Sequence, residues 1–197
     1  GQMVQYNAEF LSSEITYVHY DRATFSDHRP ARNSLVSRFL GDWLVQLDTD
    51  HEYEPDCIGR LLRWADEYDA DVLSGFYQLK QPPHLPLLFE WVKVDAAGNV
   101  GLQPLARWAK NARLLEIGSA GAGCLFVRRR VFDRIVSELK QQPFDKHAHY
   151  SEDHSFFWRC RELGIKCYAA MHVHFNHLRA RPVTPDDYCE GEVPISE

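Results

Sequence analysis

The stretch that decides the fold is WLVQLDTD, residues 43–50. Its first five residues are mostly apolar, which is typical of a short strand buried in a parallel sheet. Asp48 and Asp50 follow directly, and side chains at positions i and i+2 of an extended chain point to the same side. Ligands of open α/β sheets bind in the crevice at the carboxyl ends of the strands. The stretch therefore predicts an α/β sheet with two carboxylates at its ligand-binding edge.

Strand-like and helix-like patterns alternate on both sides of this stretch, which favours an α/β fold in a single domain spanning residues 1–197. Strands are expected at residues 14–20, 43–47, 71–77, 88–94 in a hairpin with 100–102, 114–117, 124–127 and 165–170. Helices are expected at residues 33–40, 55–68, 131–139 and 151–163. Residues 81–86 are expected to form a loop, and residues 179–197 a flexible, polar tail.

Composition excludes several classes of protein. The chain is 45% hydrophobic and 25% charged, as is ordinary for a globular domain, and no apolar run is long enough to span a membrane. Its net charge of −6, without a basic run, argues against binding to nucleic acid or to an anionic membrane surface. The five cysteines show no C-x-x-C spacing, so we expect reduced thiols and a cytoplasmic protein.

Two pairs of acids are candidates for chemistry. Asp48 and Asp50 would be poorly tolerated together without a cation, and their oxygens suit Mg²⁺ or Mn²⁺, which also bind phosphates. The alternative is that they only cap a loop or the next helix. Glu152 and Asp153 begin an amphipathic helix, where burial in a cleft would make one of them a general base. Helix capping explains one of these two acids but not both.

Histidines, glycines and one arginine add weaker signals. Three histidines occur in HVHFNH, residues 172–177, but their spacing is not that of a zinc site, and at most one is expected to bind a metal. His51 is a further metal candidate. The segment GSAGAG, residues 118–123, either lets the backbone pass close to a ligand or forms a tight connection between strands. Arg32, at an expected helix start, either binds a phosphate or is a solvated loop residue.

The order of these elements resembles that of the family 2 glycosyltransferases and related GT-A enzymes, including those of phage and environmental genomes, over roughly residues 10–178. The resemblance implies a GT-A (Rossmann-like) three-layer α/β fold with a mixed, mostly parallel central sheet. It also implies metal-dependent transfer of a sugar from a UDP- or GDP-linked nucleotide sugar to a hydroxyl group of a glycan or other acceptor. Neither nucleic acid nor a membrane is an implied partner.

The resemblance also assigns roles to the acids. The Asp-x-Asp residues Asp48 and Asp50, together with His177, would hold Mn²⁺ or Mg²⁺ on the diphosphate of the donor. Asp153, with Glu152 as its neighbour, would match the acid that deprotonates the acceptor hydroxyl in inverting members of the family. We therefore expect an inverting reaction with Asp153 as the base.

Donor binding is implied for further residues. Arg32 and Asn33 would lie by the nucleotide, and Gly121 and Gly123 would pass beside the donor sugar and the acceptor. Family members normally begin with a strand and loop that clasp the base, whereas this chain enters at a stretch that resembles the sequence after that strand. We therefore expect an N-terminally truncated domain without its first strand. The resulting exposed sheet edge favours pairing between two copies.

Two other classes of function stay open. A metal-dependent nucleotidyltransferase or hydrolase would use the same carboxylates and histidines. A catalytically inactive, truncated domain that binds a sugar or a partner protein is favoured by the missing strand. The complete set of Asp48, Asp50, Asp153 and His177 argues against an inactive domain.

Overall fold

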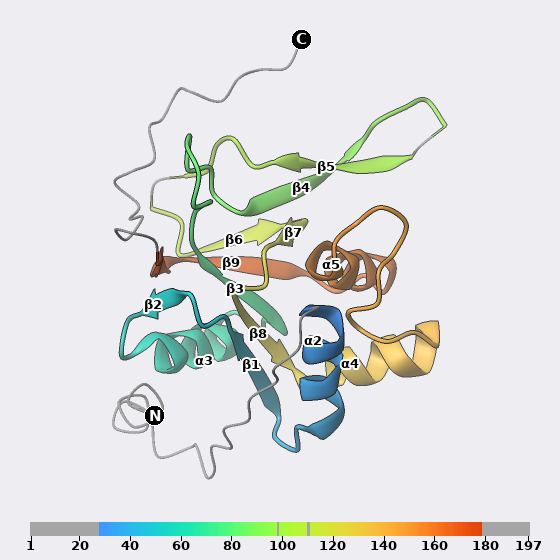
Figure 1. The fold of residues 1–197 in the computed structure, drawn as a ribbon, viewed down its shortest axis with the longest axis horizontal. Coiled ribbons are helices and arrows are strands. Elements are labelled where there is room, and N and C mark those ends of the chain that lie inside the picture. The colour runs from blue at the N-terminus through green and yellow to red at the C-terminus, as the bar shows by residue number, and fades with distance from the viewer. Residues whose placement is uncertain (1–27, 98, 110, 179–197) are drawn as a thin grey trace.

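The computed structural model describes residues 28–97, 99–109 and 111–178. The elements of this part of the chain are, in order, α2 (His28–Arg38), β1 (Trp43–Leu47), β2 (His51–Tyr53), α3 (Cys57–Glu67), β3 (Val72–Phe76), β4 (Leu88–Lys93), β5 (Val100–Pro104), β6 (Leu114–Ile117), β7 (Ser119–Ala120), β8 (Cys124–Arg128), α4 (Arg129–Arg134), its π-helical continuation η1 (Ile135–Leu139), α5 (Glu152–Glu162) and β9 (Cys167–His177). Figure 1 shows α3 on one side of the central strands and α2, α4 and α5 on the other. The expected layered α/β arrangement is confirmed.

The central sheet is mixed, as expected. Its strand order is β1-β8-β3-β9-β2, and β6 also pairs with β9. Among the described strands, β3 and β9 form the only parallel pair, so the sheet is less parallel than we expected. Between β3 and β8 the chain forms the strands β4, β5, β6 and β7, and the described residues of this part contain no crossover helix. A parallel pairing of β3 with β8 would require such a crossover. β4, β5 and β7 form a smaller second sheet.

Two hydrophobic cores cover the two faces of the central sheet. Successive side chains of a strand point to opposite faces, and in β8 Cys124 and Phe126 pack with α3, whereas Leu125 and Val127 pack with α4 and α5. All five residues of β3 are buried, because both faces of the sheet are covered at this strand. Burial on both faces explains why the central strands are nearly continuous apolar runs.

Two elements extend far beyond their expected bounds. Helix α2 already includes His28, the first described residue of this part of the chain, so it extends past the start expected at residue 33. Arg32 therefore lies inside the helix and not at its start. Strand β9 runs on to His177, past its expected end at residue 170, because its last residues pair with β2, a strand that was not expected from the sequence.

The N-terminal part of the predicted sheet lies outside the described residues. Within the described part, β1 has a strand partner on one edge only, which is β8. The strand expected at residues 14–20 and the tail at residues 179–197 are not described, so the open sheet edge and the pairing of two copies stay predictions. None of the helices in the described ranges is long and apolar enough to cross a membrane.

Candidate functional site

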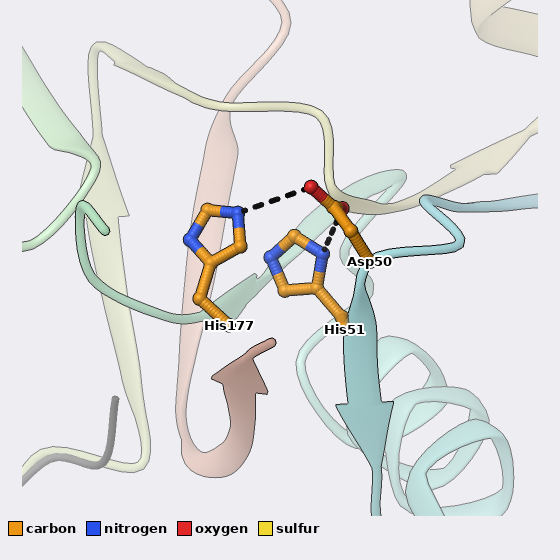
Figure 2. A group of neighbouring side chains, drawn as sticks. All are labelled: Asp50, His51 and His177. Atoms are coloured by element: carbon orange, nitrogen blue, oxygen red, sulfur yellow. Dashed lines mark hydrogen bonds and ion pairs between the residues drawn. The ribbon is translucent and has the colours of Figure 1, made fainter. Parts of the chain in front are cut away.

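Asp50, His51 and His177 converge beyond the end of β1, and we call them the acid–imidazole cluster (Figure 2). Their potential ligand atoms all lie within 4.8 Å of one another. The cluster results from the antiparallel pairing of β2 with β9, in which His51 is the register partner of His177. A hydrogen bond of 2.8 Å from the Leu178 N–H to the Asp50 carbonyl oxygen extends this pairing. A short strand thus brings together residues that are far apart in the sequence.

A hydrogen bond fixes the orientation of the imidazole of His177. Its Nδ1 lies 2.8 Å from the carbonyl oxygen of Gln78. Because a carbonyl oxygen only accepts, Nδ1 carries the proton of the neutral ring, and Nε2 keeps its lone pair. This Nε2 lies 3.8 Å from Asp50 Oδ2. The ring therefore turns Nε2 toward the carboxylate of Asp50.

The second imidazole, His51, packs tightly against the first. The two ring centroids are 4.0 Å apart, and His51 Nδ1 lies 3.1 Å from Asp50 Oδ1. His51 Nε2 is buried without a hydrogen-bond partner among the described residues. Burial and the neighbouring His177 lower the pKa of His51 to about 4, so the ring is neutral at pH 7.

The acid of the cluster stays ionised. Burial alone would raise the pKa of Asp50, but a hydrogen bond from Lys80 and the charge interactions with His51, Lys80 and His177 hold it below its ordinary value. Metals bind ionised carboxylates and neutral imidazoles, which are the protonation states that Asp50 and His51 hold at neutral pH. The donor set, the buried unpaired nitrogen of His51 and the free Nε2 of His177 therefore fit a divalent cation.

Arg32 organises a second group of predicted site residues. Its Nη2 lies 3.2 Å from Asp48 Oδ1, and its Nη1 donates to Gln46 Oε1 and to the Ala122 carbonyl oxygen, at 3.0 Å in each case. Its Nε lies 3.8 Å from Glu152 Oε1. Arg32 is only 7% exposed and thus joins the end of β1, the glycine segment and the start of α5. Asp48 faces this arginine and is not part of the acid–imidazole cluster.

The two acids of α5 have different partners. Glu152 pairs with Arg32, whereas Asp153 Oδ1 accepts hydrogen bonds from the His154 N–H, at 2.8 Å, and from the Ser151 hydroxyl. Asp153 Oδ2 makes no hydrogen bond to any of the described residues. Asp153 thus has one oxygen bonded within its own helix start, and its role as a base stays a prediction.

Tyr77 lies between the two groups. Its ring makes edge contacts with His51 and His177, with centroid separations of 4.7 and 5.6 Å. Burial raises the pKa of Tyr77 above its ordinary value, and the charges of Asp48 and Asp153 raise it further. Both carboxylates are therefore within electrostatic reach of the same phenol. That the acid–imidazole cluster and the acids around Arg32 form one functional site stays a prediction.

The two glycines singled out in the sequence pack against Tyr77. The Gly123 N–H donates to the Tyr77 hydroxyl at 2.8 Å, and its carbonyl oxygen accepts from the Asp48 N–H at 2.9 Å. A Cβ at Gly123 would lie 2.8 Å from His51 Cε1, and one at Gly121 would collide with the Tyr77 hydroxyl. Contacts within the protein thus explain both glycines. Their position beside a donor sugar and an acceptor stays a prediction.

Some predicted residues lie apart from this site, and one residue of the site was missed. The Asn33 side chain bonds to Asp145 Oδ1, at 3.0 Å, and to the Phe144 N–H, at 2.9 Å, so it ties α2 to the segment before α5. Its expected position by the nucleotide has no support from these contacts. Of the three clustered histidines, His177 alone enters the acid–imidazole cluster. Lys80 carried no signal in the sequence, because a lysine in a loop is ordinarily a solvated charge.

Comparisons with known proteins bear on both the fold and the family of this chain. The crystal structure of A197 from STIV matches with a TM-score of 0.58 and 21% identity, over 92% of this chain and 84% of that chain, which supports the fold. The search of the curated proteins finds no match. The model of the family described as "Glycosyl transferase family 2" matches residues 3–136. Because this match covers more than half of the sequence, the chain belongs to glycosyl transferase family 2.

Proposed function

We propose that the chain transfers a sugar from a UDP- or GDP-linked donor to a hydroxyl group of a glycan or other acceptor, in a reaction that depends on Mn²⁺ or Mg²⁺. The observation that carries the proposal is the convergence of Asp50, His51 and His177 within a family 2 domain. Imidazole nitrogens suit transition metals better than Mg²⁺, so this donor set favours Mn²⁺. The chemistry that such a cation supplies when bound is positive charge at the leaving diphosphate.

Asp153 is the proposed catalytic base. Its Oδ1 is fixed by the Ser151 hydroxyl and the His154 N–H, which leaves Oδ2 to take the proton of the acceptor hydroxyl. A base that acts from the face opposite the leaving group gives inversion at the anomeric carbon. Arg32, whose guanidinium is bonded to protein groups, pairs with Asp48 and Glu152 and would position both acids.

Calorimetric titration with UDP and with GDP tests the donor site. We expect one nucleotide to bind in the presence of Mn²⁺ and binding to be lost in EDTA. Asp50→Ala should lose this metal-dependent binding, whereas Asp133→Ala, which removes an exposed acid of α4, should retain it. If Asp50→Ala binds as well as the wild type, the cluster is not the cation site. If the wild type binds neither nucleotide, the chain is better explained as an inactive sugar- or protein-binding domain.

Nucleotide release from sugar nucleotides, with and without candidate acceptors, tests the base. Asp153→Asn keeps the shape of the side chain but cannot accept the proton, so it should bind the nucleotide normally and lose transfer by about a hundredfold or more. Transfer at the wild-type rate would exclude Asp153 as the base. Release of sugar or phosphate that is independent of any acceptor would instead indicate a hydrolase.

A cytoplasmic location is also part of the proposal. The four cysteines that the structure describes are buried and unpaired, namely Cys57, Cys124, Cys160 and Cys167. Burial without pairing is typical of thiols in a reducing compartment. Thiol counting on unfolded protein, isolated without reductant, should find all five cysteines of the sequence free. A count of three or fewer would indicate a disulfide and an oxidising compartment.

A further inference from the structure

Lys80 binds the carboxylate oxygen at the centre of the acid–imidazole cluster. Its Nζ lies 2.5 Å from Asp50 Oδ2, the same oxygen that is 3.8 Å from His177 Nε2. The two charged side chains are 38% and 49% exposed, so they form a half-buried ion pair. The negative charge of Asp50 is thus already balanced by the ammonium group of Lys80.

The backbone around Lys80 is fixed independently of its side chain. Lys80 lies in the segment of residues 77–87, which connects β3 to β4 and is closed by a hydrogen bond of 2.9 Å from the Leu79 N–H to the Leu85 carbonyl oxygen. The carbonyl oxygen of Gln78, in the same segment, orients the imidazole of His177. The long lysine side chain can therefore leave Asp50 by rotation, while the segment keeps its place and the imidazole keeps its orientation.

We propose that Lys80 is an internal competitor for the cation site, and that a divalent cation binds Asp50 only by displacing the Lys80 ammonium. This inference rests on the proposed function, because it requires the acid–imidazole cluster to be the cation site. An ammonium and a divalent cation bound to the same carboxylate oxygen would lie so close together that their positive charges repel each other strongly. The cation affinity of the free protein is therefore lower than it would be without the charge of Lys80.

Calorimetric titration with MnCl₂, in the absence of nucleotide, measures the competition. Lys80→Met keeps most of the length of the side chain and removes its charge, and we expect it to bind Mn²⁺ roughly threefold to tenfold more tightly than the wild type. Lys93→Met, at an exposed position of β4, is the matched control and should leave the affinity unchanged. Equal affinities of the wild type and Lys80→Met would overturn the proposal.

Amine acetylation with peptide mapping tests displacement directly. The Lys80 amine should react slowly in the cation-free protein and several-fold faster with saturating Mn²⁺, or without Mn²⁺ in Asp50→Asn. Lys166, which pairs with Glu116 at 2.9 Å and lies outside the cluster, is the internal control and should react at a constant rate. A Lys80 rate that Mn²⁺ does not change would overturn displacement, even if Lys80→Met binds Mn²⁺ more tightly.

The two experiments separate the inference from the function on which it rests. If the wild type, Lys80→Met and Lys93→Met all fail to bind Mn²⁺, the cation site itself is wrong, and the proposed function loses its metal together with the competitor. If all three bind Mn²⁺ with the same affinity, the cation site stands and the competition by Lys80 alone is refuted.

Discussion

Replacement of Gly123 by alanine tests whether this backbone position sets the geometry of the acid–imidazole cluster. The added Cβ would lie 2.8 Å from His51 Cε1 and 2.9 Å from both Cζ and the hydroxyl oxygen of Tyr77. Non-bonded carbon atoms prefer separations of about 3.5–4.0 Å, so the two contacts with carbon atoms are too short by roughly 1 Å. The His51 side chain cannot withdraw into solvent, because it is 1% exposed and stacks on His177. Either the backbone or the cluster must shift.

The magnitude follows from the cost of an overpacked core. We expect Gly123→Ala to lower the free energy of unfolding by about 1–3 kcal/mol. For a chain of this length, a loss of ~2 kcal/mol lowers Tm by roughly 4–8 °C. A displaced His51 also loses its contact with Asp50, now 3.1 Å between Nδ1 and Oδ1. Because a change in the groups that support metal ligands costs about tenfold to a hundredfold in affinity, Mn²⁺ binding should weaken at least tenfold.

Urea denaturation and calorimetric titration with Mn²⁺ measure the two effects separately. Gly41→Ala is the matched control, because a Cβ there would meet its nearest atom, the Trp43 carbonyl oxygen, at the ordinary distance of 3.6 Å. It should change the free energy of unfolding by less than about 0.5 kcal/mol. If Gly123→Ala equals the wild type in both measurements, the reasoning from contacts is refuted. Lower stability with unchanged Mn²⁺ affinity would show that strain at Gly123 does not reach the cluster.

Three further substitutions test other parts of the fold. In Gly75→Ala the new Cβ collides with the buried ring of Phe175, so urea denaturation should show a loss of about 3 kcal/mol or more, and wild-type stability would contradict the packing. Arg32→Leu leaves Asp48 and a backbone carbonyl unpaired and should cost about 2–3 kcal/mol, whereas a thermal midpoint at the wild-type value would exclude a positioning role. Burial lowers the pKa of His174 from its ordinary value of 6.5. As the pH drops below 6.5, the unfolded chain therefore binds this proton before the folded protein does, and the free energy of unfolding falls. His174→Gln should therefore lose less stability than the wild type between pH 7 and pH 5, and identical losses would refute the burial argument.

Much of the local structure could be predicted from the sequence. The strand expected at residues 43–47 matches β1 in both bounds, and the hairpin of β4 and β5 forms where the sequence placed it. The residues of β1 form a compact, mostly apolar run that packs partly buried against both cores, and such a run can be recognised without knowledge of its strand partner. The bounds of β9 could not be predicted in this way, because its last residues are strand only through their pairing with β2.

The sequence also indicated the right kinds of residue at the site, but not their partners. From the sequence we expected Asp48 and Asp50 to act as one pair, because side chains two residues apart lie on the same face of an extended chain. The strand ends at Leu47, however, and a turn at residues 49–50 breaks that period. Asp48 consequently meets Arg32, whereas Asp50 meets His51 and Lys80.

The sequence by itself determined the class of fold and the supply of acids, imidazoles and glycines, because periodicity, burial and side-chain chemistry are local properties. Only the tertiary structure decided that His51 and His177 stack beside Asp50, and that Lys80 reaches the same oxygen. Those meetings depend on the register of β2 against β9 and on the path of the segment after β3. Strand register and loop path are set by contacts between distant residues, and no local pattern in the chain encodes them.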